Sequence, residues 1–501
     1  MWVTLPWELT VWQLLLCAAL VLLFYLAYDK KYGKYSNLPP HVPGLPFFGN
    51  VFQIRGSAYF HLDLTELGKK YGDIFTIKLF GQHLVSINSG EMLANMVNDD
   101  VFPTRTVTSY ALRRIMNECD DVIWRETGHT HKQLRMTVMK ALSECESRQP
   151  LLKEEAAKLA ETLLSSERMP MCVSQEVIKS IANVLTVSLI GKRYNDKELV
   201  KLLEYGELLD FINSYNFGAE LDVFPFLRWF PVRSMKTIQA AERFAKKYVD
   251  EEVEKAMARF DPENVHCIVD RVIELMRKKS ATMPDLTDRT VNGIILDMYF
   301  AGWTTTSATL NGLIIVLLNL PEEQQRLQEE VDSVVGASKM VTLQDRERMP
   351  YTQAFVAEAL RLFSVGTLPP RAAQTDVHYK GYFFPKGTQV FYNVWAADHD
   401  PDVFEKPWRF RTSRYLDDEG RLLPPGHLIW KRSLQFGEGK RYCLGKSFAC
   451  DRLFIFITTL MQRLSFLPVE GVPPPSYDPR TFKPSIIIYP YPFEARVIPR
   501  D

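Results

Sequence analysis

The loop and helix from Phe436 to Leu460, FGEGKRYCLGKSFACDRLFIFITTL, constrain the fold of this chain more than any other stretch. Gly437 and Gly439 permit tight turns and the close approach of a flat ligand, because neither has a side chain. Cys443 stands just before an amphipathic helix, where the helix dipole favours a thiolate and Arg441 adds positive charge. By spacing alone, a cysteine beside a helix is more often a small buried apolar residue, so other motifs are needed to identify its role.

The amino terminus is a candidate membrane segment. Twenty residues from Leu9 to Tyr28 carry no charge, about the number that a helix needs to cross a bilayer. Lysines follow at once and the preceding flank has no Lys or Arg, so the positive-inside rule leaves the rest of the chain in the cytosol. A cleaved secretory peptide is the alternative, but a basic leading region and a cleavage site are missing. We expect a retained single-pass anchor at residues 1–28.

The remaining sequence indicates one large, mainly α domain with a smaller β region. Prolines between residues 39 and 46 predict a stiff, basic, proline-rich hinge at 29–50, followed by the folded domain at 51–501. Helical periodicity dominates from about 130 to 365. Strand patterns are a hairpin at 73–88 and segments at 377–395 and 485–490, separated by a long coil at about 400–440.

Composition excludes two classes of protein. Lys+Arg and Asp+Glu both number 60, so no overall positive field favours a nucleic-acid partner. The seven cysteines form no close-spaced pair, which argues against a disulfide framework and a zinc site and is typical of reduced thiols facing the cytosol.

A second feature interrupts the helical run from about 288 to 319. The stretch YFAGWTTTSA contains Gly302, which costs about 1 kcal/mol relative to Ala within a helix. Three threonines follow, and their hydroxyls can bond back to preceding carbonyls and bend the helix. We expect a local opening here; ordinary helix packing is the alternative.

These stretches together resemble the cytochrome P450 family. The family signature FxxGxRxCxG matches at Phe436, Gly439, Arg441, Cys443 and Gly445. The resemblance implies that Cys443 is the axial ligand of the iron of haem b, that Phe436 lies beside the sulfur with Gly437 in the same turn, and that Arg441 pairs with a haem propionate. A thiolate axial ligand favours O–O bond cleavage. Cys450, further along the helix, is expected to be a packing residue.

Other motifs of the family follow the same order along the chain. Glu358 and Arg361 match its ExxR pair, and the resemblance implies that Arg409 of the PWRF segment completes a structural lock with them. GHTHKQLR resembles the segment usually written GxxWxxxR, which implies propionate contacts from Arg135 and from His131, in place of Trp, as an Nε2–H donor that depends on pH. Arg371 matches a further propionate contact.

The weak stretch AGWTTT resembles the oxygen-binding groove of the family. The resemblance implies that Ala301 and Gly302 leave room for dioxygen and that the Thr305 hydroxyl orders a proton-delivering water. Many relatives carry an acid where this chain has Thr304, so the proton route is expected to use water, Thr304 and Thr305, or Asp297, with less efficient coupling.

The implied function is a haem-thiolate monooxygenase of the endoplasmic reticulum membrane, with O2 as co-substrate and a lipophilic substrate. NADPH-cytochrome P450 reductase and cytochrome b5 are the expected electron donors, meeting a basic surface that includes Lys440 and Lys446; the lipid bilayer is the other partner, and no nucleic acid is expected. Substrate contacts are expected from 101–122, 205–230, 364–369 and 480–485, while sterols, fatty acids and xenobiotics remain open. Two alternatives are a haem-thiolate isomerase or dehydratase that does not use O2, and a non-catalytic haem- or ligand-binding protein.

Overall fold

A computed structural model describes most of the chain beyond residue 33. The described residues are 11–13, 15–17, 20, 33–46, 48–55, 59–98, 101–105, 107, 109–143, 149–212, 218–279, 283, 285–485 and 487–500. Most of the predicted anchor at 1–28 therefore lies outside them. Within the described part, two stretches are long and apolar enough to cross a membrane, 173–190 and 288–319, but 67% and 78% of an apolar 18-residue window in each is buried inside the protein. We identify both as core helices.

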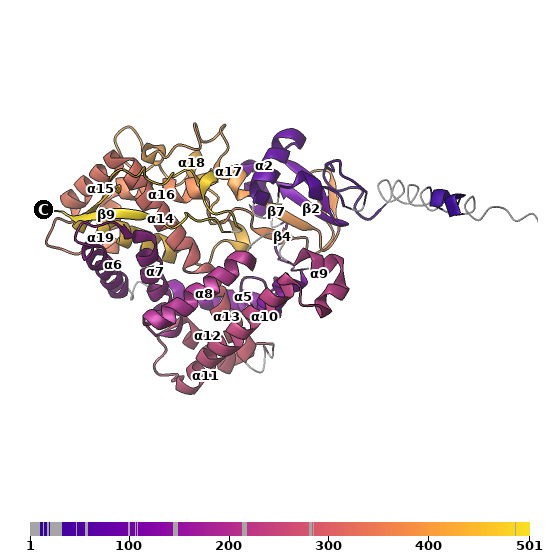
Figure 1. Cartoon of the computed structure of the whole chain (residues 1–501), viewed down its shortest axis with the longest axis horizontal. Coiled ribbons are helices and arrows are strands. Elements are labelled where there is room, and N and C mark those ends of the chain that lie inside the picture. The colour runs from indigo at the N-terminus through magenta and orange to yellow at the C-terminus, as the bar shows by residue number, and fades with distance from the viewer. Residues whose placement is uncertain are drawn as a thin grey trace, which may run out of the picture.

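Helices make up most of the folded body (Figure 1). The longer helices are α2 (Phe60–Tyr71), α5 (His129–Ser143), α6 (Gln149–Leu164), α7 (Val173–Ile190), α8 (Asp196–Ile212), α10 (Arg233–Phe244), α11 (Asp250–Arg259), α12 (Ile268–Lys279), α13 (Asp288–Ala301), α14 (Thr304–Asn319), α15 (Pro321–Val334), α16 (Pro350–Phe363) and α19 (Lys446–Arg463). The shorter ones are α3 (Gly90–Asn98), α4 (Tyr110–Ile115), α9 (Ala219–Val223), α17 (Val394–Asp398) and α18 (Leu428–Arg432). Nearly all of α14 is buried, so the main core is built around it.

The strands form a smaller part of the fold, whose largest sheet is drawn at the right of the body in Figure 1. Its largest sheet has the order β1 (Ile74–Leu79), β2 (Gln82–Ile87), β7 (Gln389–Tyr392) and β4 (Pro370–Ala372), with β2 and β7 parallel. The predicted hairpin is confirmed: β1 and β2 pair antiparallel across Phe80 and Gly81, whose φ values are 46° and 84°. The mainly α fold with a smaller β region is therefore confirmed.

The carboxyl-terminal strands differ from the prediction. A short sheet joins β3 (Met171–Cys172), β9 (Glu494–Pro499) and β8 (Leu464–Leu467), and a separate hairpin joins β5 (Val377–Tyr379) to β6 (Tyr382–Phe384). At 485–490, where a strand was expected, Ile487 and Tyr489 make single bridges only. Pro490 and Pro492 follow directly, and prolines lack the N–H that a continued ladder needs.

Residues 38–46 and 48–50, which the sequence assigns to the hinge, lie along β1. The N–H of Val42 donates to Thr76 O at 2.9 Å, and the N–H of Thr76 donates to Pro40 O at 2.8 Å. Asn50 is fully buried, and its Oδ1 accepts the N–H of Lys78 at 2.8 Å. These contacts extend the folded body toward residue 38.

Candidate functional site

The turn before α19 has the geometry that its glycines predict. Gly437 and Gly439 have φ values of 63° and 67°, in the left-handed region that favours glycine. The chain then returns on itself, because the N–H of Cys443 donates to Phe436 O at 2.8 Å. The turn thus presents Cys443 just ahead of the amino terminus of α19.

The electrostatics at Cys443 differ from the sequence-based expectation. Its side chain has accessible surface, yet it is enclosed deeply enough that desolvation raises the pKa of the thiol. A hydrogen bond from the backbone of Gly445 and the charges of Arg135, Arg105 and Arg452 act in the opposite direction. The loop alone therefore does not ionise the sulfur, and a bound metal ion would supply the missing stabilisation. By contrast, Cys450 is half-buried and desolvation raises its pKa to about 11, in keeping with packing.

Four arginines gather next to the cysteine turn: Arg105, Arg135, Arg371 and Arg441. Burial lowers the pKa of each, and the neighbouring guanidinium groups lower several of these values further, that of Arg441 to about 9. The Nε of Arg105 is buried and has no hydrogen-bond partner. Buried cations that repel one another need an anion. The cluster consequently fits the two propionates of a haem whose iron would be held by Cys443.

The sequence did not identify Arg105 as a member of this cluster. No local pattern marks it, because it lies in a loop more than 300 residues before Cys443 and joins the other arginines only in three dimensions. Arg135 and Arg371 both contact the cysteine turn through its backbone. Arg135 Nη2 donates to Tyr442 O at 2.5 Å, and Arg371 Nη2 donates to the backbone O of Arg441 at 3.4 Å.

His131 accepts a hydrogen bond where a donor was expected. Arg441 Nη1 lies 2.8 Å from His131 Nε2, and an arginine can only donate, so the Nε2 atom carries no proton. Burial, then the charges of Arg441 and Arg135, lower the pKa of His131 to about 3. The imidazole is therefore neutral at physiological pH, and the expected pH-dependent donor contact is not what the structure shows. The other N–H groups of Arg441 donate to oxygens of Pro103, Ile123, Arg125 and Thr127.

The structural lock predicted from Glu358, Arg361 and Arg409 contains a different third residue. Arg361 and Glu358 are fully buried and pair at 2.8 Å, as predicted. Arg409 is exposed, and Glu358 is instead reached by Arg414, whose Nε lies 3.2 Å from Oε2. The PWRF segment still takes part through its backbone, since Pro407 O accepts Arg361 Nη2 at 2.9 Å.

The predicted opening of the long helix is confirmed, because α13 ends at Ala301 and α14 begins at Thr304. Thr304 Oγ1 donates to Phe300 O at 2.8 Å and Thr305 Oγ1 donates to Ala301 O at 2.9 Å. Both threonines are half-buried. Their lone pairs remain available to a small ligand or a water molecule.

Residues on α7 and α8 pack against the break at Gly302 and Trp303. A Cβ on Gly302 would lie 2.7 Å from both Leu185 Cδ1 on α7 and the backbone O of Met298, so a larger residue would force a shift there. Trp303 is buried, and a Cβ on Gly206 of α8 would lie 2.8 Å from its ring. The bulky side chain at position 303 thus fills space beneath α8.

Asp297 holds the loop before α5. Its Oδ2 accepts the N–H groups of Val122 and Ile123, both at 2.9 Å. Burial, and then the charge of Asp121, raise the pKa of Asp297 well above its ordinary value, and burial raises that of Asp121 to about 7. The pair therefore retains a proton near neutral pH.

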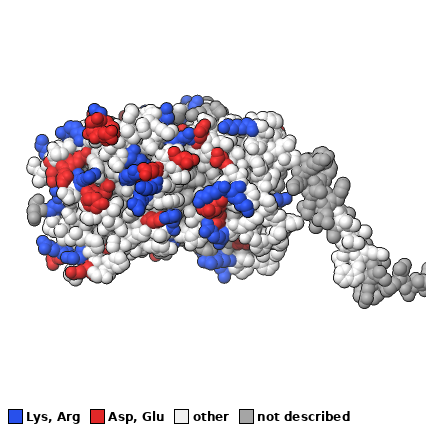
Figure 2. All heavy atoms as spheres, turned by 90° about the horizontal axis from the view of Figure 1, so that it is seen from above, with Lys and Arg blue, Asp and Glu red and all other residues white. Residues whose placement is uncertain are grey.

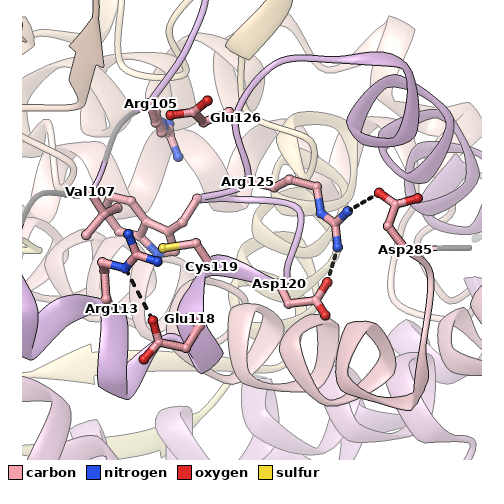
Figure 3. A pocket seen from close by; sticks show the side chains of 10 residues that line it. Arg105, Val107, Arg113, Glu118, Cys119, Asp120, Arg125, Glu126 and Asp285 are labelled. Atoms are coloured by element: carbon pink, nitrogen blue, oxygen red, sulfur yellow. Dashed lines mark hydrogen bonds and ion pairs between the residues drawn. The ribbon is translucent and has the colours of Figure 1, made fainter. Parts of the chain in front are cut away.

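A polar cavity of about 430 Å³ opens beside Arg105 (Figure 3). Arg125 bridges Asp120 and Asp285 along one side, and Arg113 pairs with Glu118 at 3.2 Å on the other. Much of its wall comes from the 101–122 region that was predicted to contact substrate, and this part of the region is mainly charged.

The fold and the cysteine turn fit a haem-thiolate protein, and sequence comparison identifies the family: the chain belongs to the cytochrome P450 family, whose model matches residues 39–496. Cytochrome P450 1A1 of Limanda limanda is 28% identical over 464 residues, which cover 87% of this chain and 86% of that protein. Steroid 17-alpha-hydroxylase/17,20 lyase of Gallus gallus is 28% identical over 482 residues, 93% of each chain. Cytochrome P450 1A5 of Gallus gallus is 28% identical over 454 residues, 86% of this chain and 85% of that protein. The chain is thus an oxidoreductase of the P450 monooxygenase kind.

Proposed function

We propose that this protein inserts one oxygen atom from O2 into a lipophilic substrate, with electrons that NADPH-cytochrome P450 reductase draws from NADPH. The observation that carries the proposal is the placement of Cys443 at the end of a glycine turn, beside four buried or half-buried arginines, most of which lower one another's pKa. Haem b would supply oxygen activation when bound. Cys443 would ligate the iron, while Arg105, Arg135 and Arg371 would hold the propionates.

The arginines would divide this work. Arg441 already donates to four protein oxygens and to His131, so it has little capacity left for a ligand. Arg105 has an unsatisfied buried Nε, which gives it the strongest need for an anion. In this arrangement Arg441 and His131 position the loop, and Arg105 makes a direct contact.

At the helix break, Thr305 and Thr304 would handle protons. Each hydroxyl donates to a carbonyl one turn earlier and can accept a hydrogen bond from a water molecule. Asp297 is engaged with the loop at 122–123, which leaves the threonines and water as the favoured route. Product formed per NADPH consumed should therefore be incomplete in the wild type and should fall in Thr305→Ala.

We propose that the catalytic body lies on the cytosolic face of the endoplasmic reticulum membrane, anchored by residues 1–28. Large apolar side chains exposed near the sheet and around Pro225–Trp229 support membrane contact: Trp229 is 87% exposed and Phe52 is 71% exposed. The face in Figure 2 carries few charges at the end next to the amino-terminal trace. Lys440 and Lys446 are exposed and would serve the reductase, with cytochrome b5 as a second donor.

Substrate contacts would come from the regions 101–122, 205–230, 364–369 and 480–485, of which residues 106, 108 and 213–217 lie outside the described part of the chain. Phe482 of the last region packs on Phe363 with ring centroids 5.5 Å apart, so aromatic side chains meet there. Oxygen consumption that depends on NADPH, reductase and added lipophilic compound tests the proposal. Turnover of such a compound without oxygen uptake would favour an isomerase or dehydratase, and haem binding without any turnover would favour a carrier.

A further inference from the structure

Arg452 is a buried cation on α19 that lies outside the arginine cluster. It follows Cys443 by nine residues and is only 2% exposed. Its Nη1 donates to Gly302 O at 2.8 Å, and its Nε donates to Phe448 O at 3.3 Å. The guanidinium lies 4.1 Å from the ring centroid of Phe448, close enough for a cation–π contact. The side chain therefore connects the cysteine helix to the break in the central helix.

The acceptor that Arg452 uses is the carbonyl at the break itself. In an uninterrupted α-helix, Gly302 O would accept the N–H of Thr306, four residues later. Here Gly302 and Trp303 leave the regular helix, and the guanidinium takes the place of that N–H. Gly302 is half-buried, and a carbonyl that is shielded from water without a donor is costly, so the bond from Arg452 stabilises the opening.

Arg452 is the polar member of a set of contacts around the break. Leu185 of α7 occupies the space beside Gly302, and the ring of Trp303 occupies the space beside Gly206 of α8. These two apolar contacts restrict where the backbone of the break can lie. The hydrogen bond from Arg452 gives Gly302 O a donor in place of the lost helical N–H. The charge of Arg452 also acts on Cys443, where it favours the thiolate.

We propose that Arg452 is a positioning residue that keeps the central helix open at Gly302, so that the hydroxyls of Thr304 and Thr305 stay at the opening. The contribution of Arg452 to catalysis rests on the proposed monooxygenase function, whereas its effect on the helix does not depend on that function. Losing the guanidinium should let Gly302 O pair again with the N–H of Thr306 and close the groove.

Amide hydrogen exchange on the haem-loaded full chain tests this directly. In Arg452→Met, the amides of Thr305 and Thr306 should exchange more slowly than in the wild type, by roughly two- to tenfold, the factor expected for one net hydrogen bond. Arg452→Lys retains a donor and the charge, so it should restore exchange close to that of the wild type. Arg346→Met is the matched control. Arg346 donates to Cys450 O and pairs with Asp451, both on α19, but it does not contact the break.

Unchanged or faster exchange of both amides in Arg452→Met, with haem retained, would overturn the proposal. If that variant does not fold, Arg452→Gln gives the same test, because its shorter amide cannot keep both bonds and the same slowing is expected. Product per NADPH should fall in Arg452→Met and recover in Arg452→Lys. An absence of oxygen consumption by the wild type would contradict the proposed function. The amide exchange result would still decide the role of Arg452.

Discussion

Arg414 Nε lies 3.2 Å from Glu358 Oε2, and both side chains are almost fully buried. Glu358 therefore shares its charge between Arg361, on its own helix, and Arg414, from the long coil that leads to Cys443. Through this contact the carboxylate ties the coil to α16.

Replacing Arg414 should weaken the protein more than replacing Arg409. Arg414→Ala leaves one side of a buried carboxylate uncompensated and should lower the free energy of unfolding by about 2 kcal/mol. Arg409 is exposed, and Arg409→Ala should change it by less than about 0.5 kcal/mol. Denaturant unfolding followed by the haem absorbance measures both, and a larger effect at Arg409 would show that the lock is assigned incorrectly.

The protonation state of His131 predicts a pH dependence of stability. Its pKa is about 3 in the folded protein and 6.5 for an ordinary imidazole, so the unfolded state binds more protons between these limits. Stability is therefore fully present above pH 6.5 and is lost as the pH falls, by up to about 1.4 kcal/mol per pH unit from this group. His131→Gln keeps an acceptor for Arg441 and should remove this contribution. Identical pH profiles for the two proteins would contradict a neutral, buried His131.

Asp297 should act through its hydrogen bonds rather than through a negative charge. Asp297→Asn preserves an oxygen acceptor for the N–H groups of Val122 and Ile123 and should retain stability near neutral pH. Asp297→Leu removes the acceptor from two buried donors and should cost about 2 to 3 kcal/mol. Comparing the two variants by thermal unfolding separates these effects, and equal losses would show that the charge is what matters.

The glycine at the helix break should be intolerant for a specific steric reason. In Gly302→Ala the new Cβ would meet Leu185 and Met298 O, both at 2.7 Å, and overpacking of this kind costs about 1 to 3 kcal/mol. Adding Leu185→Ala should relieve the side-chain part of the clash. The melting temperature of the double variant should therefore fall by less than the sum of the decreases in the two single variants. Strict additivity of the two decreases would argue against the contact.

The sequence predicted features that depend on local chemistry. The hairpin at 73–88, the glycine turn before Cys443 and the opening at Gly302 each follow from residues that are adjacent in the chain. The Glu358–Arg361 pair follows from helical spacing. These predictions hold because backbone preferences alone determine them.

Features that depend on distant segments could not be predicted in this way. Whether Arg409 or Arg414 reaches Glu358 depends on the path of the coil, which turns at Lys406 with a φ of 50°. The role of Arg105 depends on its meeting arginines from three other parts of the chain. His131 is an acceptor because Arg441 points at it, which its own segment does not reveal.

The central claim, that Cys443 holds haem iron as a thiolate, is tested most directly by the difference spectrum of the dithionite-reduced protein with and without carbon monoxide. We expect a strongly red-shifted Soret band in the wild type that is lost in Cys443→His. A wild-type band typical of imidazole or weak ligation would contradict the claim, because it would show that Cys443 does not bind the iron in its ionised form.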